Sequence, residues 1–176
     1  MTRQEHASGT ERLAEVAAGL EAPLWVNIQG DEPLVDPEDI DGLVEALRSE
    51  AGVAMATPKR PIENHEDFHS PHVVKVVTNR AGDALYFSRA PIPFPRRAAE
   101  PIGFRHVGLY AYRRELLLKI AAGPRSWLES SEELEQLRVL EMGFGIRVLD
   151  ARGDSIGVDV PEDLDRVRAR LKRSTR

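Results

Sequence analysis

Leu24-Trp-Val-Asn-Ile28 and the directly following Gln29-Gly-Asp-Glu-Pro33 are the stretch of sequence that decides the fold. The first five residues form a near-continuous apolar run, which is typical of a buried central strand, and the next five are typical of a loop. A loop at the carboxyl end of a buried strand is where α/β proteins bind their ligands. We therefore predict a strand over residues 24–28 and a functional site in the loop that follows it.

Helices and a further strand are expected on both sides of this strand. Ser8 and Glu11 have the spacing of a capping box before a short helix. A second helix is predicted over residues 37–47, with Asp36 as its N-cap and a proline at its first position. Residues 53–57 form another apolar run of strand length. The order helix, strand, helix, strand favours a sheet of parallel strands.

The middle of the chain has a pattern typical of antiparallel strands. Residues 73–78 and 84–87 flank Asn79-Arg-Ala-Gly-Asp83, which predicts a hairpin turn. The prolines in residues 88–95 rule out a helix there and favour an extended loop. Residues 104–112 are expected to form one further strand of this insert.

The last third of the chain predicts helices over residues 113–122 and 129–142, a strand over residues 146–149 and an amphipathic helix over residues 161–171. The last five residues form a basic tail with no predicted structure. The fold class is therefore predicted to be α/β, with a mixed, mostly parallel sheet, helices on both faces and an antiparallel insert. All of this is expected in a single domain, residues 1–176.

The composition excludes several classes of protein. With 41% hydrophobic and 30% charged residues and a net charge of -5, the chain has the balance of an ordinary globular protein. It contains no cysteine, which excludes a disulfide framework, a thiolate metal site and a cysteine nucleophile. The acidic balance argues against nonspecific nucleic-acid binding. Neither a signal peptide nor a membrane-spanning run is present, so we expect a cytoplasmic protein.

Asp31 and Asp159 are the first candidates for chemistry. Asp31 follows the apolar strand, and Asp159 precedes the last predicted helix. Each has an alternative interpretation, because Gly-Asp-Glu-Pro is also common in turns and an acidic residue is also favoured at a helix N-terminus. At a separation of ~4 Å the two carboxylates would repel each other by about 4 kcal/mol, at an effective dielectric constant of about 20. They would therefore need a proton or a cation between them, and Mg²⁺ prefers such oxygen ligands.

Further candidates are basic, aromatic and polar. Arg89 stands in the proline-rich loop and has the fork geometry that binds carboxylates, although a surface ion pair is an equal alternative. His106 and Tyr110 are expected on one face of one strand, where a histidine is more often structural than a ligand. Glu135 and Gln136 lie in a charge-rich helix, which is typical of a solvated face.

Five longer motifs, taken together and in order, resemble the 3-deoxy-manno-octulosonate cytidylyltransferase family, also called the CMP-Kdo synthetase family. The resemblance extends from Met1 to about Arg170 and implies that residues 1–176 form a single domain of nucleotidyltransferase type. The motifs are Asn27-Ile-Gln-Gly-Asp-Glu-Pro33, Ala84-Leu-Tyr-Phe-Ser-Arg-Ala-Pro-Ile-Pro93, Arg105-His-Val-Gly-Leu-Tyr-Ala-Tyr-Arg113, Leu134-Glu-Gln-Leu-Arg-Val-Leu140 and Gly157-Val-Asp-Val-Pro-Glu-Asp-Leu164.

The resemblance implies an enzyme that joins CTP to 3-deoxy-manno-octulosonate (Kdo), giving CMP-Kdo and pyrophosphate for lipopolysaccharide synthesis. It also implies a homodimer with the antiparallel insert at the interface, and Mg²⁺ held by Asp31 and Asp159. The positions that match the family's Kdo-binding residues are Gln29, Arg89, His106, Tyr110, Glu135 and Gln136. Those that match the stretch lining the nucleotide are His6, Ser8, Gly9 and Thr10.

Members of the family begin with a strand and a basic loop around the CTP phosphates, and nothing of this kind precedes Met1. We therefore expect an N-terminally truncated chain that lacks the first βαβ part, has an unpaired sheet edge and has little or no activity alone. Two alternatives remain open. One is CMP transfer to a related acidic sugar, such as an amino-Kdo or a sialic acid, and the other is a non-catalytic remnant that binds sugar or dimerises.

Overall fold

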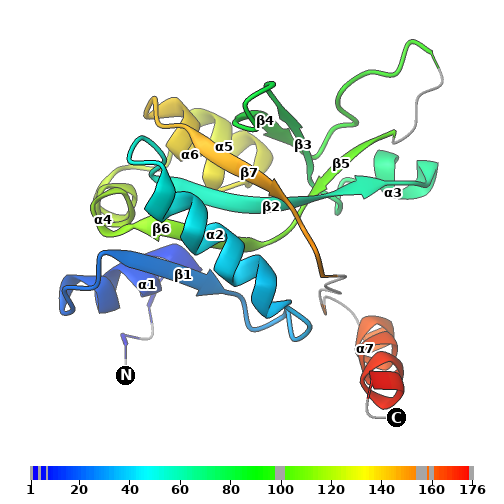
Figure 1. The fold of residues 1–176 in the computed structure, drawn as a ribbon. Coiled ribbons are helices and arrows are strands. Elements are labelled where there is room, and N and C mark those ends of the chain that lie inside the picture. The colour runs from blue at the N-terminus through cyan, green and yellow to red at the C-terminus, as the bar shows by residue number, and fades with distance from the viewer. Residues whose placement is uncertain are drawn as a thin grey trace.

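A computed structural model describes residues 2–3, 5–6, 8–97, 102–153, 158 and 161–174. The described residues form seven helices and seven strands (Figure 1). In chain order these are α1 (Gly9–Ala18), β1 (Leu24–Ile28), α2 (Pro37–Ser49), β2 (Met55–Ile62), α3 (His65–His69), β3 (Lys75–Thr78), β4 (Ala84–Ser88), β5 (Gly103–His106), β6 (Leu109–Arg113), α4 (Arg114–Ala122), α5 (Trp127–Glu132), α6 (Gln136–Glu141), β7 (Ile146–Asp150) and α7 (Pro161–Ser174).

The strands form one mixed sheet in the order β1-β6-β2-β5-β3-β4, and β7 pairs with β2. The α/β class is confirmed, but the expected balance of strand directions is corrected. Among the described strands only the β2–β7 pairing is parallel, because β6 lies between β1 and β2 and is antiparallel to both. β1, β2 and β7 therefore do run in the same direction, as the helix–strand order predicts, without all being neighbours.

Helices cover both faces of this sheet, as expected (Figure 1). The side chains of β6 alternate between the two faces of the sheet. Leu109 and Ala111 pack with α2, whereas Tyr110 and Tyr112 face the opposite side. That opposite side contains the larger core, to which α1, α4 and α6 contribute apolar side chains. β6 is thus buried on both faces, and β2, which pairs with β5, β6 and β7, takes the central place in the sheet.

β1 was expected in the centre of the sheet and is instead its first strand. It pairs with β6, and no second partner strand lies beside it among the described residues. Its residues are half-buried up to Asn27, and Ile28 is 51% exposed. An apolar run predicts a strand but does not distinguish a central position from an edge, because both bury at least one face.

Two predicted elements are each divided into two. The strand expected over residues 104–112 is interrupted between β5 and β6, which pair with different parts of β2. The helix expected over residues 129–142 is also interrupted. Its first part, α5, ends at Glu132, because Glu133 has a left-handed backbone with φ of 53°. A new helix, α6, then begins at Gln136. This break places Glu135 and Gln136 at a helix start instead of on a solvated helix face.

Local boundaries are predicted more accurately than the sheet order. Ser8 caps α1, Asp36 caps α2 with Pro37 in its first turn, and the side chain of Asn79 closes the β3–β4 turn. β2 and α7 run further than expected, to Ile62 and Ser174, so part of the basic tail is helical. None of the described helices is long and apolar enough to cross a lipid bilayer.

Candidate functional site

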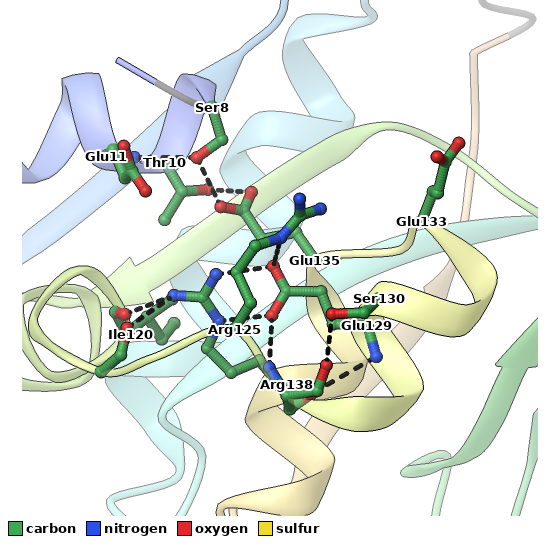
Figure 2. A network of polar contacts seen from close by, with 12 residues as sticks. Ser8, Thr10, Glu11, Ile120, Arg125, Glu129, Ser130, Glu133, Glu135 and Arg138 are labelled. Atoms are coloured by element: carbon green, nitrogen blue, oxygen red, sulfur yellow. Dashed lines mark hydrogen bonds and ion pairs between the residues drawn. The ribbon is translucent and has the colours of Figure 1, made fainter. Parts of the chain in front are cut away.

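The starts of α1 and α6 meet at the carboxylate of Glu135. Ser8 Oγ accepts a hydrogen bond from the Glu11 N–H at 3.2 Å, which caps α1, and donates its own proton to Glu135 Oε1 at 2.6 Å. Thr10 Oγ1 donates to Glu135 Oε2, also at 2.6 Å (Figure 2). Ser8 and Thr10, which are expected on the nucleotide side, are therefore in direct contact with Glu135, which is expected on the sugar side.

The start of α6 is held by a buried ion pair behind it. Arg138 Nε and Nη2 donate to the two carboxylate oxygens of Glu129 at 2.6 Å each, and both side chains are at most 5% exposed (Figure 2). Arg138 Nη1 also donates to the carbonyl oxygens of Ile120 and Gly123 at the end of α4. Burial is the largest single influence on Glu129 and opposes its ionisation. The hydrogen bonds from Arg138 and from the Ser126 N–H, together with the charges of Arg138 and Arg125, nevertheless hold the pKa below its ordinary value. The pair thus ties α4, α5 and α6 together beneath the site.

Next to Glu135 lies a row of buried, neutral polar side chains. The hydroxyl of Tyr110 donates to Gln136 Oε1 at 3.4 Å, and the rings of Tyr110 and His106 are 5.2 Å apart between centroids. His106 Nε2 is 2.9 Å from the hydroxyl of Thr57. Burial lowers the pKa of His106 to about 3, so its ring is neutral at pH 7. The interruption between β5 and β6 leaves the two rings in contact, as their spacing predicted.

The cavity beside this row is too small for a sugar. The cavity beside Tyr110 and Gln136 has a volume of about 10 Å³, which is roughly the space of one water molecule. The open space lies on the other side of Glu135. There, a surface pocket of about 470 Å³ is lined by Thr2, Gly9, Arg12, Leu13, Val16, Asn27, Ile28, Gln29, Gly30, Asp31 and Glu135.

The surface pocket joins four of the predicted site residues, namely Gly9, Gln29, Asp31 and Glu135. Gln29 reaches across to the chain between β5 and β6, since a side-chain carbon added at Gly108 would lie 3.5 Å from Gln29 Nε2. The pocket therefore lies between the start of α1 and the end of β1, at the carboxyl end of that strand, where the sequence predicts a functional site.

Asp31 is an exposed residue in the turn that follows β1. Its backbone carbonyl accepts a hydrogen bond from the N–H of Val158 at 2.8 Å, so Val158, the neighbour of Asp159 in sequence, lies at this turn. Asp159 itself lies outside the described residues. An exposed carboxylate that lines an open pocket suits Mg²⁺, which commonly takes one or two carboxylates and completes its shell with substrate phosphates and water.

Two other predicted residues are engaged by local partners. The ring of His6 is hydrogen-bonded to the Glu15 carboxylate of α1, and its side chain is only 6% exposed. The guanidinium of Arg89 donates to three backbone carbonyls, through Nε to Glu132 at 2.7 Å, Nη1 to Pro71 at 2.9 Å and Nη2 to Glu133 at 3.5 Å. Arg89 thus lies against the end of α5, and no surface ion pair of the kind considered from the sequence is found for it among the described residues.

Sequence reasoning missed Arg12 and Asn27, which both line the surface pocket. Arg12 Nη1 donates to Thr2 Oγ1 and to the Arg3 carbonyl, which places a cation on the α1 side of the pocket. Signals for both residues exist in the sequence. Arg12 follows Ser8 by one helical turn, and Asn27 is the one polar residue within the apolar run that forms β1.

Comparison with known families and curated proteins finds close relatives over nearly the whole chain. Residues 1–150 match the family model described as Cytidylyltransferase. The chain is 52% identical to the 3-deoxy-manno-octulosonate cytidylyltransferase of Syntrophotalea carbinolica, over 98% of this chain and 72% of that protein. It is 54% identical to the enzyme of the same name from Solibacter usitatus, over 99% of this chain and 69% of that protein.

Solved structures give the same picture. The structure of CMP:2-keto-3-deoxy-manno-octonic acid synthetase complexed with CTP superposes with a TM-score of 0.92 at 42% identity, over 99% of this chain and 72% of that chain. The 4-diphosphocytidyl-2C-methyl-D-erythritol synthase of Anaerococcus prevotii superposes with a TM-score of 0.56 at 12% identity, over 95% of this chain and 68% of that chain. The second likeness concerns the fold alone.

Proposed function

Because the chain belongs to the 3-deoxy-manno-octulosonate cytidylyltransferase family, we propose that it transfers CMP from CTP to Kdo, releasing pyrophosphate. The CMP-Kdo formed would serve lipopolysaccharide synthesis. The observation that best supports this proposal is the surface pocket, where Gly9, matched to the nucleotide side, lies with Gln29 and Glu135, matched to the sugar side. A transferase of this kind has to hold both substrates in one space.

In the proposed reaction the anomeric oxygen of Kdo attacks the α-phosphorus of CTP in line with the leaving group. A bond forms between that oxygen and phosphorus, the bond from phosphorus to the pyrophosphate oxygen breaks, and the hydroxyl proton leaves to water. Such transfers depend on positioning and on neutralising phosphate charge more than on covalent chemistry. The position of the pocket at the N-terminus of α1 suits this task, because helix N-termini favour anions.

Asp31, together with Asp159, would hold Mg²⁺ at the carboxyl end of β1. When bound, Mg²⁺ supplies positive charge for the triphosphate oxygens. The exposed carboxylate of Asp31 on the wall of the pocket supports this assignment.

The remaining residues would bind the sugar acid. Arg89 is proposed for its carboxylate, since a guanidinium has five N–H donors and backbone carbonyls occupy three of them. Gln29, His106, Tyr110, Glu135 and Gln136 are proposed for its hydroxyl groups. The neutral state of His106 supports this, because a neutral imidazole can both donate and accept a hydrogen bond.

We further propose a cytoplasmic homodimer that uses the antiparallel insert as its interface. Two exposed apolar side chains support a covered surface there, namely Leu85 on β4, which is 61% exposed, and Phe94 in the proline-rich loop, which is 82% exposed. Sedimentation equilibrium of the purified protein measures its oligomeric state. The mass of a single chain at all concentrations would contradict the dimer.

The proposed function is tested by incubating the purified protein with CTP, Mg²⁺ and one acidic sugar, and measuring pyrophosphate. We expect release to depend on both Mg²⁺ and Kdo, and to be lower with N-acetylneuraminate. Binding of Kdo is measured in parallel by titration calorimetry, which gives a readout that does not depend on turnover. Absence of both Kdo binding and Kdo-dependent release would contradict the proposal, and equal release with N-acetylneuraminate would favour a different acidic sugar.

A further inference from the structure

Lys75, in the first position of β3, is a fully buried cation that the proposed reaction does not use. Its side chain is 0% exposed, and Nζ donates to three backbone carbonyls. Two of these, Ser70 and Val73, belong to the chain that leads into β3, at 2.8 and 2.5 Å. The third is the carbonyl of Arg89, at 2.6 Å, beyond the end of β4. Burying an ammonium group is costly unless it is hydrogen-bonded. The three carbonyls provide these hydrogen bonds and fix the position of Lys75.

Glu132, at the end of α5, holds the same short segment from the other side. One carboxylate oxygen accepts a hydrogen bond from Ser88 Oγ at 2.6 Å, and the other accepts one from the Arg89 N–H at 2.9 Å. The backbone carbonyl of Glu132 accepts from Arg89 Nε at 2.7 Å. Arg89 is therefore fixed at its backbone N–H by Glu132, at its backbone carbonyl by Lys75, and at its guanidinium by the end of α5.

Part of the guanidinium remains available among the described residues. Of its five N–H donors, three bind the carbonyls of Pro71, Glu132 and Glu133, so each terminal nitrogen keeps one further N–H with no partner in the described part of the chain. Two guanidinium donors can bind the two oxygens of a carboxylate. The local charge is compatible with an anionic ligand, since two cations, Lys75 and Arg89, lie near the carboxylate of Glu132.

We propose that Lys75 is a positioning residue that fixes Arg89 for the carboxylate of an acidic sugar, with Glu132 as its counterpart on α5. This inference rests on the proposed function, in which Arg89 binds the sugar acid. It assigns to the β3–β4 hairpin a role in substrate specificity, because the hairpin carries both Lys75 and the segment that presents Arg89. A purely structural lysine would stabilise the hairpin without favouring a carboxylate in the ligand.

The test compares Kdo with its methyl ester, which has the same hydroxyl groups but no negative charge. Each ligand is titrated calorimetrically into the wild type and into Lys75→Met. The wild type is expected to bind the acid more tightly than the ester. In Lys75→Met we expect the Kd of the acid to rise about 10- to 100-fold while that of the ester changes little, because a misplaced guanidinium affects only the charged ligand.

Two further variants make the result decisive. Glu132→Gln keeps the shape of the side chain and is expected to give a smaller loss in the same direction, and it decides the question if Lys75→Met does not fold. Arg147→Met is the matched control, since Arg147 is a half-buried cation that holds Asp83 at the opposite end of the same hairpin. It should leave the acid-to-ester ratio unchanged.

The outcomes separate this inference from the function on which it rests. If the wild type binds Kdo and the acid-to-ester ratio is unchanged in Lys75→Met and Glu132→Gln, Lys75 has a structural role and the inference is overturned alone. If acid and ester weaken equally in both variants, the same conclusion follows. If the wild type does not bind Kdo at all, the proposed function is overturned and this inference with it.

Discussion

The two sides of Glu135 differ in how far they are organised without a ligand. On the inner side, His106, Tyr110 and Gln136 are in contact with one another, neutral and backed by the Glu129–Arg138 ion pair. On the outer side, Gln29, Gly30 and Asp31 are exposed around an open pocket of about 470 Å³. A preformed polar surface binds at low entropic cost, whereas the role proposed for Asp31 depends on a cation and on substrate phosphate. We therefore expect changes on the inner side to affect folding first, and changes on the outer side to affect turnover.

The largest effect is expected from breaking the support of the inner side. Arg138→Met leaves the buried Glu129 carboxylate without its partner, so the free energy of unfolding should fall by about 3–5 kcal/mol. Urea denaturation measures this free energy of unfolding. The double variant Arg138→Met with Glu129→Leu removes the uncompensated charge as well and should recover most of the loss. A single variant within ~1 kcal/mol of the wild type would show that the ion pair does not support this side.

On the outer side, Asp31→Ala should reduce turnover and leave the stability of the fold almost unchanged. Loss of a magnesium ligand is expected to reduce Mg²⁺-dependent pyrophosphate release about 100-fold, which corresponds to about 2.7 kcal/mol in the barrier. The free energy of unfolding should stay within ~0.5 kcal/mol, because the side chain is exposed. Calorimetric titration of CTP with and without Mg²⁺ provides a readout that does not need turnover. An unchanged dependence on Mg²⁺ would contradict the ligand assignment.

The pH dependence of stability tests whether the inner side is neutral. His106 has a pKa of about 3 in the folded protein because it is buried, against an ordinary value of 6.5. As the pH falls below 6.5, the unfolded chain therefore binds a proton that the folded chain does not. The free energy of unfolding should fall by up to about 1.4 kcal/mol per pH unit between pH 6.5 and 5 from this group.

His106→Gln should reduce the dependence of the free energy of unfolding on pH. Urea denaturation at several pH values measures this slope. His72, which is exposed, supplies the control, since His72→Gln should leave the slope as it is. A slope that is the same in the wild type and in His106→Gln would mean that His106 titrates normally in the folded state.

The smallest effect is expected where the two sides meet. Ser8→Ala removes both the N-cap of α1 and one donor to Glu135, and should lower the free energy of unfolding by about 1 kcal/mol. Ser8→Thr keeps the hydroxyl and should restore most of the stability. Chemical denaturation of both variants under one set of conditions checks the difference. Equal stability of wild type and Ser8→Ala would indicate that the contact with Glu135 adds nothing to the fold.

The elements that could be predicted from the sequence are those with local causes. Ser8, Asp36 and Asn79 each bind backbone groups within four residues, so short patterns are sufficient to place α1, α2 and the β3–β4 turn. The position of β1 at the sheet edge could not be predicted, because it depends on β6, which pairs with it from more than 80 residues away. The left-handed backbone at Glu133 also has no local signal, since that conformation favours glycine.

The candidate site shows the same division. Motif resemblance identified the family, which the comparisons confirm, and four of the residues that it selected, Gly9, Gln29, Asp31 and Glu135, line one pocket. It did not indicate that Glu135 binds Ser8 and Thr10, because those contacts span about 127 residues of chain. The roles assigned to Lys75 and Glu132 rest on hydrogen bonds to backbone carbonyls and amides, which no side-chain pattern reveals. The metal-binding roles of Asp31 and Asp159 stay predictions.

One carboxylate shared by two helix starts has a thermodynamic consequence. A nucleotide that draws the hydroxyls of Ser8 and Thr10 toward itself would take donors away from Glu135, whose oxygens then seek new partners such as sugar hydroxyls. The affinities of the two substrates would then be linked, and by reciprocity each would change the other's by the same factor. The coupling between the two binding events would in that case originate from the hydrogen bonds of a single side chain.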